Sequence, residues 1–118
     1  MKTVAIYYRV STERQDLASQ KLAVEQWIDN LPDDKKPQKT IVFKDEGISG
    51  KTTRRPEFQK MLDMAWNRQI DTIIFYRLDR FSRHATTAIK LILNLDDAGV
   101  AFISVSHNEL SELFPLVF

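Results

Sequence analysis

Four short apolar segments, rich in β-branched and aromatic residues, recur along the chain between stretches of helical periodicity. They are TVAIYYRV (3–10), TIVF (40–43), DTIIFYRL (71–78) and AFISVS (101–106). Each has the composition of a β-strand. Several are continuously apolar rather than alternating, which is typical of strands buried on both faces of a parallel sheet. The sequence therefore predicts an α/β fold in three layers, with a mainly parallel sheet of about four strands and helices on both faces.

The stretches between these segments predict the helices. Residues 16–29 carry apolar side chains at helical spacing, and a second helix is expected to start at Pro56, because proline suits a first helical turn. Its apolar stripe consists of Phe58, Met61, Leu62, Ala65 and Trp66. A third helix is expected from Ala85 to a point near Gly99.

Arginine-bearing segments follow three of the predicted strands. They read RVSTER, KDEGISGKTTRR and RLDRFSR. Because ligands bind at the carboxyl ends of strands in such sheets, we expect these segments to converge on one edge and to form the functional site there.

Length and composition exclude several kinds of protein. A chain of 118 residues suits one domain with its own core. The sequence contains no cysteine, which excludes disulfides, structural zinc clusters and thiol chemistry. No apolar run approaches the ~20 residues of a membrane span, and the N-terminus lacks a signal-peptide pattern. We therefore expect a cytoplasmic protein without a membrane partner.

Positive charge is concentrated in the middle of the chain. Residues 51–90 carry nine basic and four acidic side chains, a net +5, whereas the whole chain has a formal net charge of +1. A basic segment in a nearly neutral chain is compatible with a local polyanion site and with an ordinary solvated face. Charge alone leaves both interpretations open.

Gly50-Lys51-Thr52 matches the end of a nucleotide-binding loop. That loop requires Gly-x-x-x-x-Gly-Lys-Ser/Thr and a helix that starts at the lysine. The first glycine would stand at residue 45, which is Asp45, and Pro56 marks a later helix start. We therefore expect no bound nucleotide.

Two polar residues near the first predicted strand have competing explanations. Ser11 shares a strand face with Tyr7 and Arg9, which places a hydroxyl and a cation together at the strand end. A serine there is either a helix cap or a nucleophile activated by its surroundings. Gln20 falls on the apolar stripe of the first helix, where it either lines a site or marks the edge of the stripe.

The segment RLDRFSRH (77–84) holds three arginines and an aspartate in a predicted strand-to-helix turn. The planar fork of arginine matches phosphate oxygens and stays charged. Several such forks around one serine would stabilise a phosphoryl-transfer transition state without a metal. The alternative is a set of ordinary surface salt bridges with Asp79.

Taken together, these motifs resemble the catalytic domain of the serine recombinases, the resolvase and invertase family. The matching text is YYRVSTERQDLASQ (7–20), DEGISGKTTRRPEF (45–58) and YRLDRFSRH (76–84). The resemblance extends over about residues 3–106 and implies a resolvase-like fold.

The resemblance implies an enzyme that cleaves and rejoins DNA strands at specific sites. Ser11 would be the nucleophile that attacks a scissile phosphodiester, forms a 5′-phosphoserine link and frees a 3′-hydroxyl. The arginines that would hold and neutralise that phosphate are Arg9, Arg55, Arg80 and Arg83.

Further roles follow from the same resemblance. Asp79 would help to protonate the leaving oxygen, and Gln20 and Asp45 would line the site. The loop that would meet the DNA phosphate and carry Arg55 into the site contains Ser49, Gly50 and Lys51. Because the phosphoserine conserves the bond energy, such an enzyme needs neither ATP nor a metal or other cofactor.

The end of the chain departs from the family pattern. We expect residues 1–106 to form the catalytic domain and residues 107–118 to be a remnant where the dimerisation helix would begin, with no DNA-binding domain in the chain. The implied partners are DNA and, in the full-length protein, further copies in a dimer or tetramer, acting at the nucleoid. The alternatives are a non-catalytic regulatory or dimerisation module and the nucleotide-binding enzyme described above.

Overall fold

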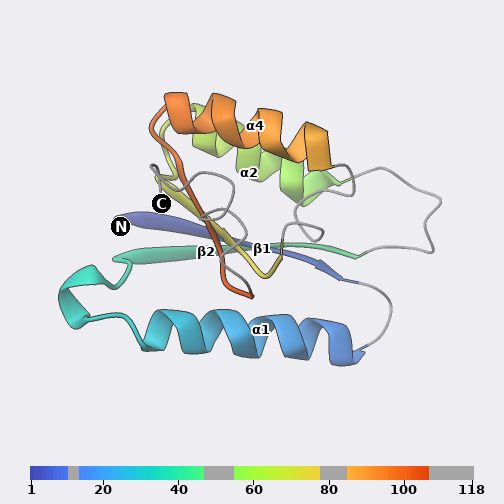
Figure 1. The fold of residues 1–118 in the computed structure, drawn as a ribbon, viewed down its shortest axis with the longest axis vertical. Helices are drawn as coiled ribbons and strands as arrows, with labels where there is room; N and C mark the ends of the chain where they lie inside the picture. Colours follow the sequence, from blue (N-terminus) through green and yellow to red (C-terminus); the bar gives the residue numbers. More distant parts are fainter. Residues whose placement is uncertain (11–13, 47–54, 78–84, 107–118) are drawn as a thin grey trace.

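A parallel sheet forms the centre of the structure, a computed structural model that describes residues 1–10, 14–46, 55–77 and 85–106 (Figure 1). Its strands are β1 (Thr3–Val10), β2 (Lys39–Glu46), β3 (Thr72–Phe75) and β4 (Ala101–Ser104), in the spatial order β2-β1-β3-β4. Each neighbouring pair runs parallel. The predicted four-stranded parallel α/β fold is confirmed.

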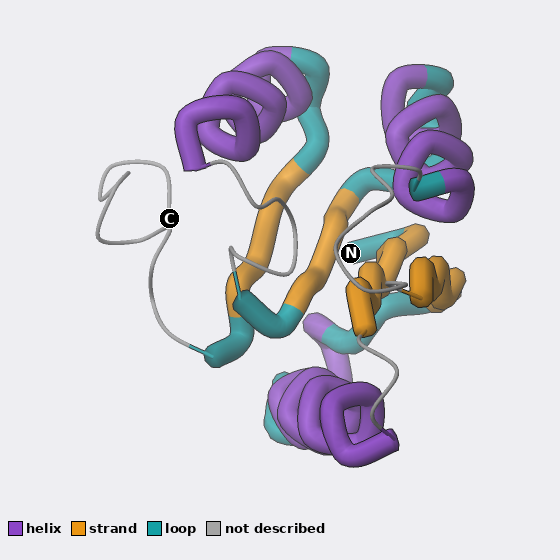
Figure 2. The backbone as a smooth tube through the Cα atoms, turned by 90° about the vertical axis from the view of Figure 1, so that its right-hand side faces the viewer, coloured by secondary structure: helices purple, strands orange, loops and turns teal. Residues whose placement is uncertain are grey.

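Helices cover both faces of this sheet. They are α1 (Arg14–Asp29), α2 (Pro56–Trp66) and α4 (Ala85–Asp97), and a short 3-10 helix, η1 (Asp33–Lys35), precedes β2. Helix α1 lies on one side of the sheet and α2 and α4 lie on the other, as two views at right angles show (Figures 1 and 2). Among the described residues, no helix has the length and apolar character needed to cross a membrane.

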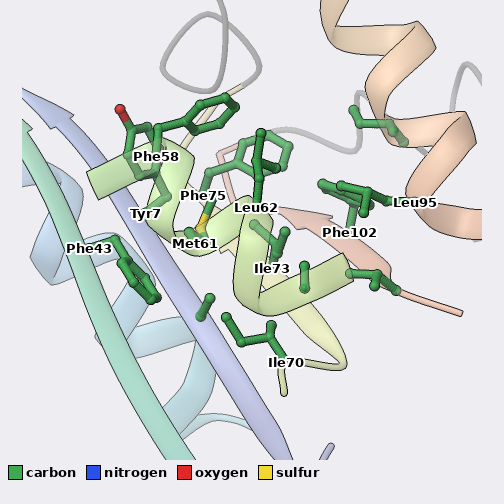
Figure 3. Close-up of a cluster of buried hydrophobic side chains, with 14 of the residues drawn as sticks. Tyr7, Phe43, Phe58, Met61, Leu62, Ile70, Ile73, Phe75, Leu95 and Phe102 are labelled. Atoms are coloured by element: carbon green, nitrogen blue, oxygen red, sulfur yellow. The ribbon is translucent and has the colours of Figure 1, made fainter. Parts of the chain in front are cut away.

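Side-chain alternation along β1 divides the core in two. Ala5 and Tyr7 face α2 and α4, whereas Val4, Ile6 and Tyr8 face α1. All five side chains are buried. The cluster on the α2 side contains the aromatic side chains of Phe43, Phe58, Phe75 and Phe102 (Figure 3). Because β1 is central and buried on both faces, its carboxyl end is fixed relative to both layers of helices.

The predicted bounds hold for β1 but not for β2, which was expected only at residues 40–43, or for β3. Strand β1 spans the predicted residues 3–10, and β2 extends to Glu46 because all eight of its residues pair with β1. Strand β3 is shorter than the apolar run 71–78, since its pairing with β1 and β4 ends at Phe75.

Helices α2 and α4 end in the same way but with different residues. The N–H of Gln69 donates to the C=O of Met64 (2.9 Å), which closes α2 around Arg68 in the left-handed region (φ 62°). Gly99 takes the equivalent place after α4 (φ 90°), as the sequence predicted. Only glycine adopts this conformation without a steric cost, so Arg68 stores strain at the end of α2.

Replacing Arg68 by glycine should therefore stabilise the protein. We expect Arg68→Gly to raise the free energy of unfolding by about 0.5–1 kcal/mol, and Gly99→Ala to lower it by about 1 kcal/mol. Urea unfolding followed by circular dichroism would measure both changes. A loss of stability in Arg68→Gly would contradict this explanation of the turn.

Asp71 anchors the amino end of the sheet. Its carboxylate accepts hydrogen bonds from the N–H of Lys2 (2.8 Å), from the N–H of Thr3 (3.0 Å) and from the hydroxyl of Thr72 (2.7 Å). Partial burial by itself raises the pKa of this carboxyl, but the three hydrogen bonds and the positive charge of the N-terminus outweigh it and lower the pKa below its ordinary value of 3.8.

The lowered pKa makes part of the stability depend on acid pH. The contribution of Asp71 is complete above its unfolded-state pKa and is lost as the pH falls through its lower folded-state pKa. Asp71→Asn should therefore flatten the pH dependence of the urea midpoint below about pH 4, whereas Asp34→Asn, at an exposed carboxylate, should not. Equal slopes in the two variants would contradict the assignment.

Candidate active site

The carboxyl ends of β1 and β2 lie side by side and carry two of the predicted site residues. Arg9 of β1 stands opposite Asp45 of β2 in the parallel register. The structure also describes Gln20 and Arg55. The other predicted site residues lie outside the described residues and stay predictions; they are Ser11, Ser49, Gly50, Lys51, Asp79, Arg80 and Arg83.

Asp45 binds the first turn of α2 from the neighbouring strand. Its Oδ1 accepts the N–H of Glu57 (3.1 Å) and its Oδ2 accepts the N–H of Phe58 (3.0 Å). Arg55, at the N-cap position, makes no side-chain cap hydrogen bond, and Pro56 has no N–H to satisfy. The buried carboxylate therefore caps the helix in place of a local N-cap side chain and offsets the positive end of its dipole.

Tyr7 joins Asp45 to Arg55. The Tyr7 hydroxyl donates to Oδ2 of Asp45 (2.9 Å) and accepts a hydrogen bond from Nε of Arg55 (3.1 Å). Burial raises the pKa of Tyr7 above its ordinary value of 10.0, and the nearby Asp45 carboxylate raises it further against the opposing charge of Arg55. The hydroxyl therefore stays protonated and makes both hydrogen bonds at once.

Arg55 lies on an aromatic platform. Its guanidinium carbon is 3.6 Å from the centre of the Phe58 ring and 5.1 Å from the centre of the Tyr7 ring. These two rings meet edge to face, 5.2 Å apart at 61°, at one end of the aromatic cluster (Figure 3). Stacking and the hydrogen bond to Tyr7 together fix the plane of the guanidinium.

Gln20 ties α1 to the end of β1. Its Nε2 donates to the C=O of Arg9 (3.2 Å) and, at a longer 3.4 Å, to that of Asp16. The side chain is only 1% exposed, so it does not mark the edge of the helix stripe. Its Oε1 accepts no hydrogen bond from any part of the chain that the structure describes. Gln20 thus holds the backbone two residues before Ser11, and its role in lining a site stays a prediction.

Sequence reasoning did not assign Tyr7 or Phe58 to the site. Tyr7 shares a predicted strand face with Arg9, and this shared face is the sequence signal that could have assigned Tyr7 to the site. Phe58 fitted the apolar stripe of α2, and it does belong to the core. Nothing in the sequence distinguishes a core phenylalanine from one that also supports an arginine.

The described part of the site contains two arginines and one carboxylate that is already hydrogen-bonded. Arg9 and Arg55 supply cations at the carboxyl end of the sheet, whereas Asp45 is engaged by two backbone N–H groups and a hydroxyl. No group of three or more metal-ligating side chains occurs within residues 1–10, 14–46, 55–77 and 85–106. The N-terminus of α2 begins at Pro56 and is closed by Asp45, so it offers no support for a nucleotide phosphate there.

Comparisons with known proteins all point to one family. The model of the family described as "Resolvase, N terminal domain" matches residues 4–114. The transposon Tn552 DNA-invertase BinR of Staphylococcus aureus is 35% identical over 104 residues, which cover 86% of this chain and 46% of that protein. The DNA-invertase of Enterobacteria phage P7 is 33% identical over 102 residues, which cover 86% of this chain and 48% of that protein. The chain thus spans about half the length of the curated relatives it matches.

Solved structures agree with these relatives. The N-terminal catalytic domain of TP901-1 integrase superposes with a TM-score of 0.71 at 27% identity, over 98% of this chain and 91% of that domain. A resolvase-family site-specific recombinase from Streptococcus pneumoniae gives a TM-score of 0.70 at 26% identity, over 89% of this chain and 72% of that protein.

Removal of the Asp45 carboxylate should destabilise the fold. Asp45→Ala leaves two N–H groups and the Tyr7 hydroxyl without their acceptor, so we expect a loss of about 2–4 kcal/mol in the free energy of unfolding. Asp45→Asn keeps one acceptor oxygen and should lose less.

A matched control is Glu46→Gln, the next residue of the same strand. Glu46 makes an exposed ion pair with Lys44 (3.6 Å), and its loss should change the free energy of unfolding by less than about 0.5 kcal/mol. Equal effects of Asp45→Ala and Glu46→Gln would contradict the capping role.

Proposed function

The chain belongs to the resolvase family of serine recombinases, whose N-terminal domain corresponds to residues 4–114, and on this premise we propose that it is the catalytic part of a site-specific DNA recombinase. Its substrate is a phosphodiester of duplex DNA. In this proposal residues 1–106 are the catalytic domain, and residues 107–118 are a remnant where the family's dimerisation helix would begin.

The reaction exchanges one phosphodiester for another. The Oγ of Ser11 bonds to phosphorus as its proton passes to a base or to solvent, and the bond from phosphorus to the 3′ oxygen breaks. The 3′ oxygen takes a proton, for which Asp79 is the donor, and becomes a hydroxyl. The reverse attack by a 3′-hydroxyl on the phosphoserine rejoins the strand, so the sequence of steps consumes neither ATP nor a redox equivalent.

Arginine side chains stabilise the charge that develops on the phosphate oxygens. Arg9 and Arg55 come from segments far apart in the sequence, and Arg80 and Arg83 join them in this proposal. Preorganised cations are effective here because they need no reorientation as the transition state forms. Ser49, Gly50 and Lys51 meet the DNA phosphates beside the site.

One observation supports this proposal most strongly. Arg55 bonds to Tyr7, which lies two residues before Arg9 on the same face of β1. Cations from two separate segments therefore stand at the carboxyl end of one central strand, immediately before Ser11. A solvated surface would not require an arginine held on two aromatic rings.

DNA and further copies of the protein are the proposed partners. The net +5 of residues 51–90 suits a phosphate backbone. The relatives named "resolvase" and "DNA-invertase" favour recombination over the non-catalytic alternative. Exchange of strands between two duplexes also requires more than one active site, which is the reason to propose a dimer or tetramer.

Replacement of Ser11 should abolish cleavage and preserve binding. The protein that contains this chain would first select duplexes from a random-sequence DNA pool, and the bound duplexes would then be assayed for covalent protein–DNA adducts by denaturing electrophoresis. We expect Ser11→Ala to lose the adduct at least 1,000-fold, on the order of the loss when a nucleophile is removed, and to bind DNA within about twofold of wild type.

Ser19→Ala, at an exposed serine of α1, is the control and should form the adduct normally. An adduct that persists in Ser11→Ala would refute the nucleophile. Wild-type protein that binds selected duplexes without ever forming an adduct would favour the non-catalytic module instead.

A further inference from the structure

The Arg55 side chain is oriented by directional contacts as well as by packing. The residues that take part are Tyr7, Asp45 and Phe58. The hydroxyl of Tyr7 is a hydrogen-bond acceptor for Nε of Arg55 (3.1 Å), and the ring of Phe58 lies 3.6 Å from the guanidinium carbon. Asp45 accepts a hydrogen bond from the Tyr7 hydroxyl (2.9 Å) and so fixes the direction in which that hydroxyl points. Each of these contacts constrains a different degree of freedom of one side chain.

We propose that Tyr7 is a positioning residue, which orients Arg55 for contact with the scissile phosphate. This inference rests on the proposed function. Tyr7 does not touch the reacting atoms in this account; it acts through Arg55, and Asp45 and Phe58 act with it.

The nitrogen atoms of Arg55 that are already hydrogen-bonded determine how its guanidinium can meet a phosphate. Arginine contacts phosphate bidentately either through Nε with one Nη, from the side, or through the two Nη atoms, from the end. The hydrogen bond to Tyr7 occupies Nε and so blocks the side-on edge. Stacking on Phe58 sets the plane of the guanidinium, so the two contacts together fix how Arg55 is presented.

The protonation of Tyr7 supports the same role. Burial keeps its pKa high, so the hydroxyl stays neutral over the working range of pH. A neutral hydroxyl can donate to Asp45 and accept from Arg55 together, whereas a phenolate could do only the second. Tyr7 is therefore suited to orientation rather than to proton transfer.

The location of Arg55 makes such support necessary. Arg55 directly precedes α2, with non-helical backbone angles (φ −136°, ψ 71°). A long side chain at a helix boundary loses several rotamers when it is fixed, at an entropic cost of about 2 kcal/mol. The core already fixes the Tyr7 hydroxyl and the Phe58 ring. Because these groups order the Arg55 side chain in the free protein, its entropic cost is met on folding and not on DNA binding.

Tyr7→Phe tests the proposal, because it removes the hydroxyl and keeps the ring. We expect the rate of covalent adduct formation on the selected duplexes to fall at least about tenfold, with DNA affinity within about twofold of wild type, as expected when a reactive group is misplaced but still present. Tyr8→Phe is the matched control: it makes the same change at the next residue, on the opposite face of β1. It should cleave as wild type does.

A double-mutant cycle shows whether Tyr7 acts through Arg55. In an Arg55→Ala background, Tyr7→Phe should change the rate by less than about twofold, because the side chain that it positions is absent. A full additional tenfold loss in that background would overturn the proposal. The pH profile of Tyr7→Phe should also keep the wild-type shape, and a lost ionisation would reassign Tyr7 as an acid–base group.

Two outcomes separate this inference from the proposed function. If wild type forms the adduct and Tyr7→Phe does so at the wild-type rate, the positioning role fails and the recombinase activity stands. If wild type forms no adduct, NMR of the Arg55 Nε–H decides the positioning separately. A slowly exchanging Nε–H that is lost in Tyr7→Phe and retained in Tyr8→Phe supports the orientation, and one that persists in Tyr7→Phe overturns it.

Discussion

The carboxylate of Asp45 connects three parts of the chain that are distant in sequence. It lies one residue before the end of β2, at the edge of the sheet. It accepts hydrogen bonds from the hydroxyl of Tyr7 in the central strand and from two backbone N–H groups in the first turn of α2. A buried carboxylate is tolerated only when donors surround it, and here each donor is structural. The place where α2 begins, and hence the place of Arg55, depends on this one group.

A series of direct contacts links Asp45 to the candidate site. The carboxylate orients the hydroxyl of Tyr7, the hydroxyl orients Nε of Arg55, and the Phe58 ring sets the guanidinium plane. On the other face of β1, Gln20 holds the carbonyl of Arg9 from α1. The end of the central strand is therefore fixed from both layers of helices immediately before Ser11.

Local patterns predicted the elements, and tertiary contacts determined what the patterns missed. Apolar runs and helical stripes predicted the strand and helix order, because burial on a sheet face has a definite period. Gly99 marked a helix end by its conformational freedom, whereas Arg68 adopts the same left-handed conformation without any sequence signal. The early end of β3 reflects its partners rather than its own composition.

The candidate site was predictable to a smaller degree. Strand and helix periodicity drew attention to Arg9 and Gln20, and the resemblance to the serine recombinases supplied the site roles of Arg9, Gln20, Asp45 and Arg55. The hydrogen bond between Tyr7 and Asp45 spans 38 residues of sequence, and neither partner signals the other. The structural role of Asp45 as a remote cap likewise needs the fold, since no residue next to Pro56 indicates it.

The central claim is that this sheet edge holds a phosphodiester, and a crystal structure of the protein grown in sulfate tests it most directly. We predict a sulfate within hydrogen-bonding distance of Ser11 and of the Arg55 guanidinium. A sulfate bound instead by the backbone of residues 47–52, with none beside Ser11, would contradict it.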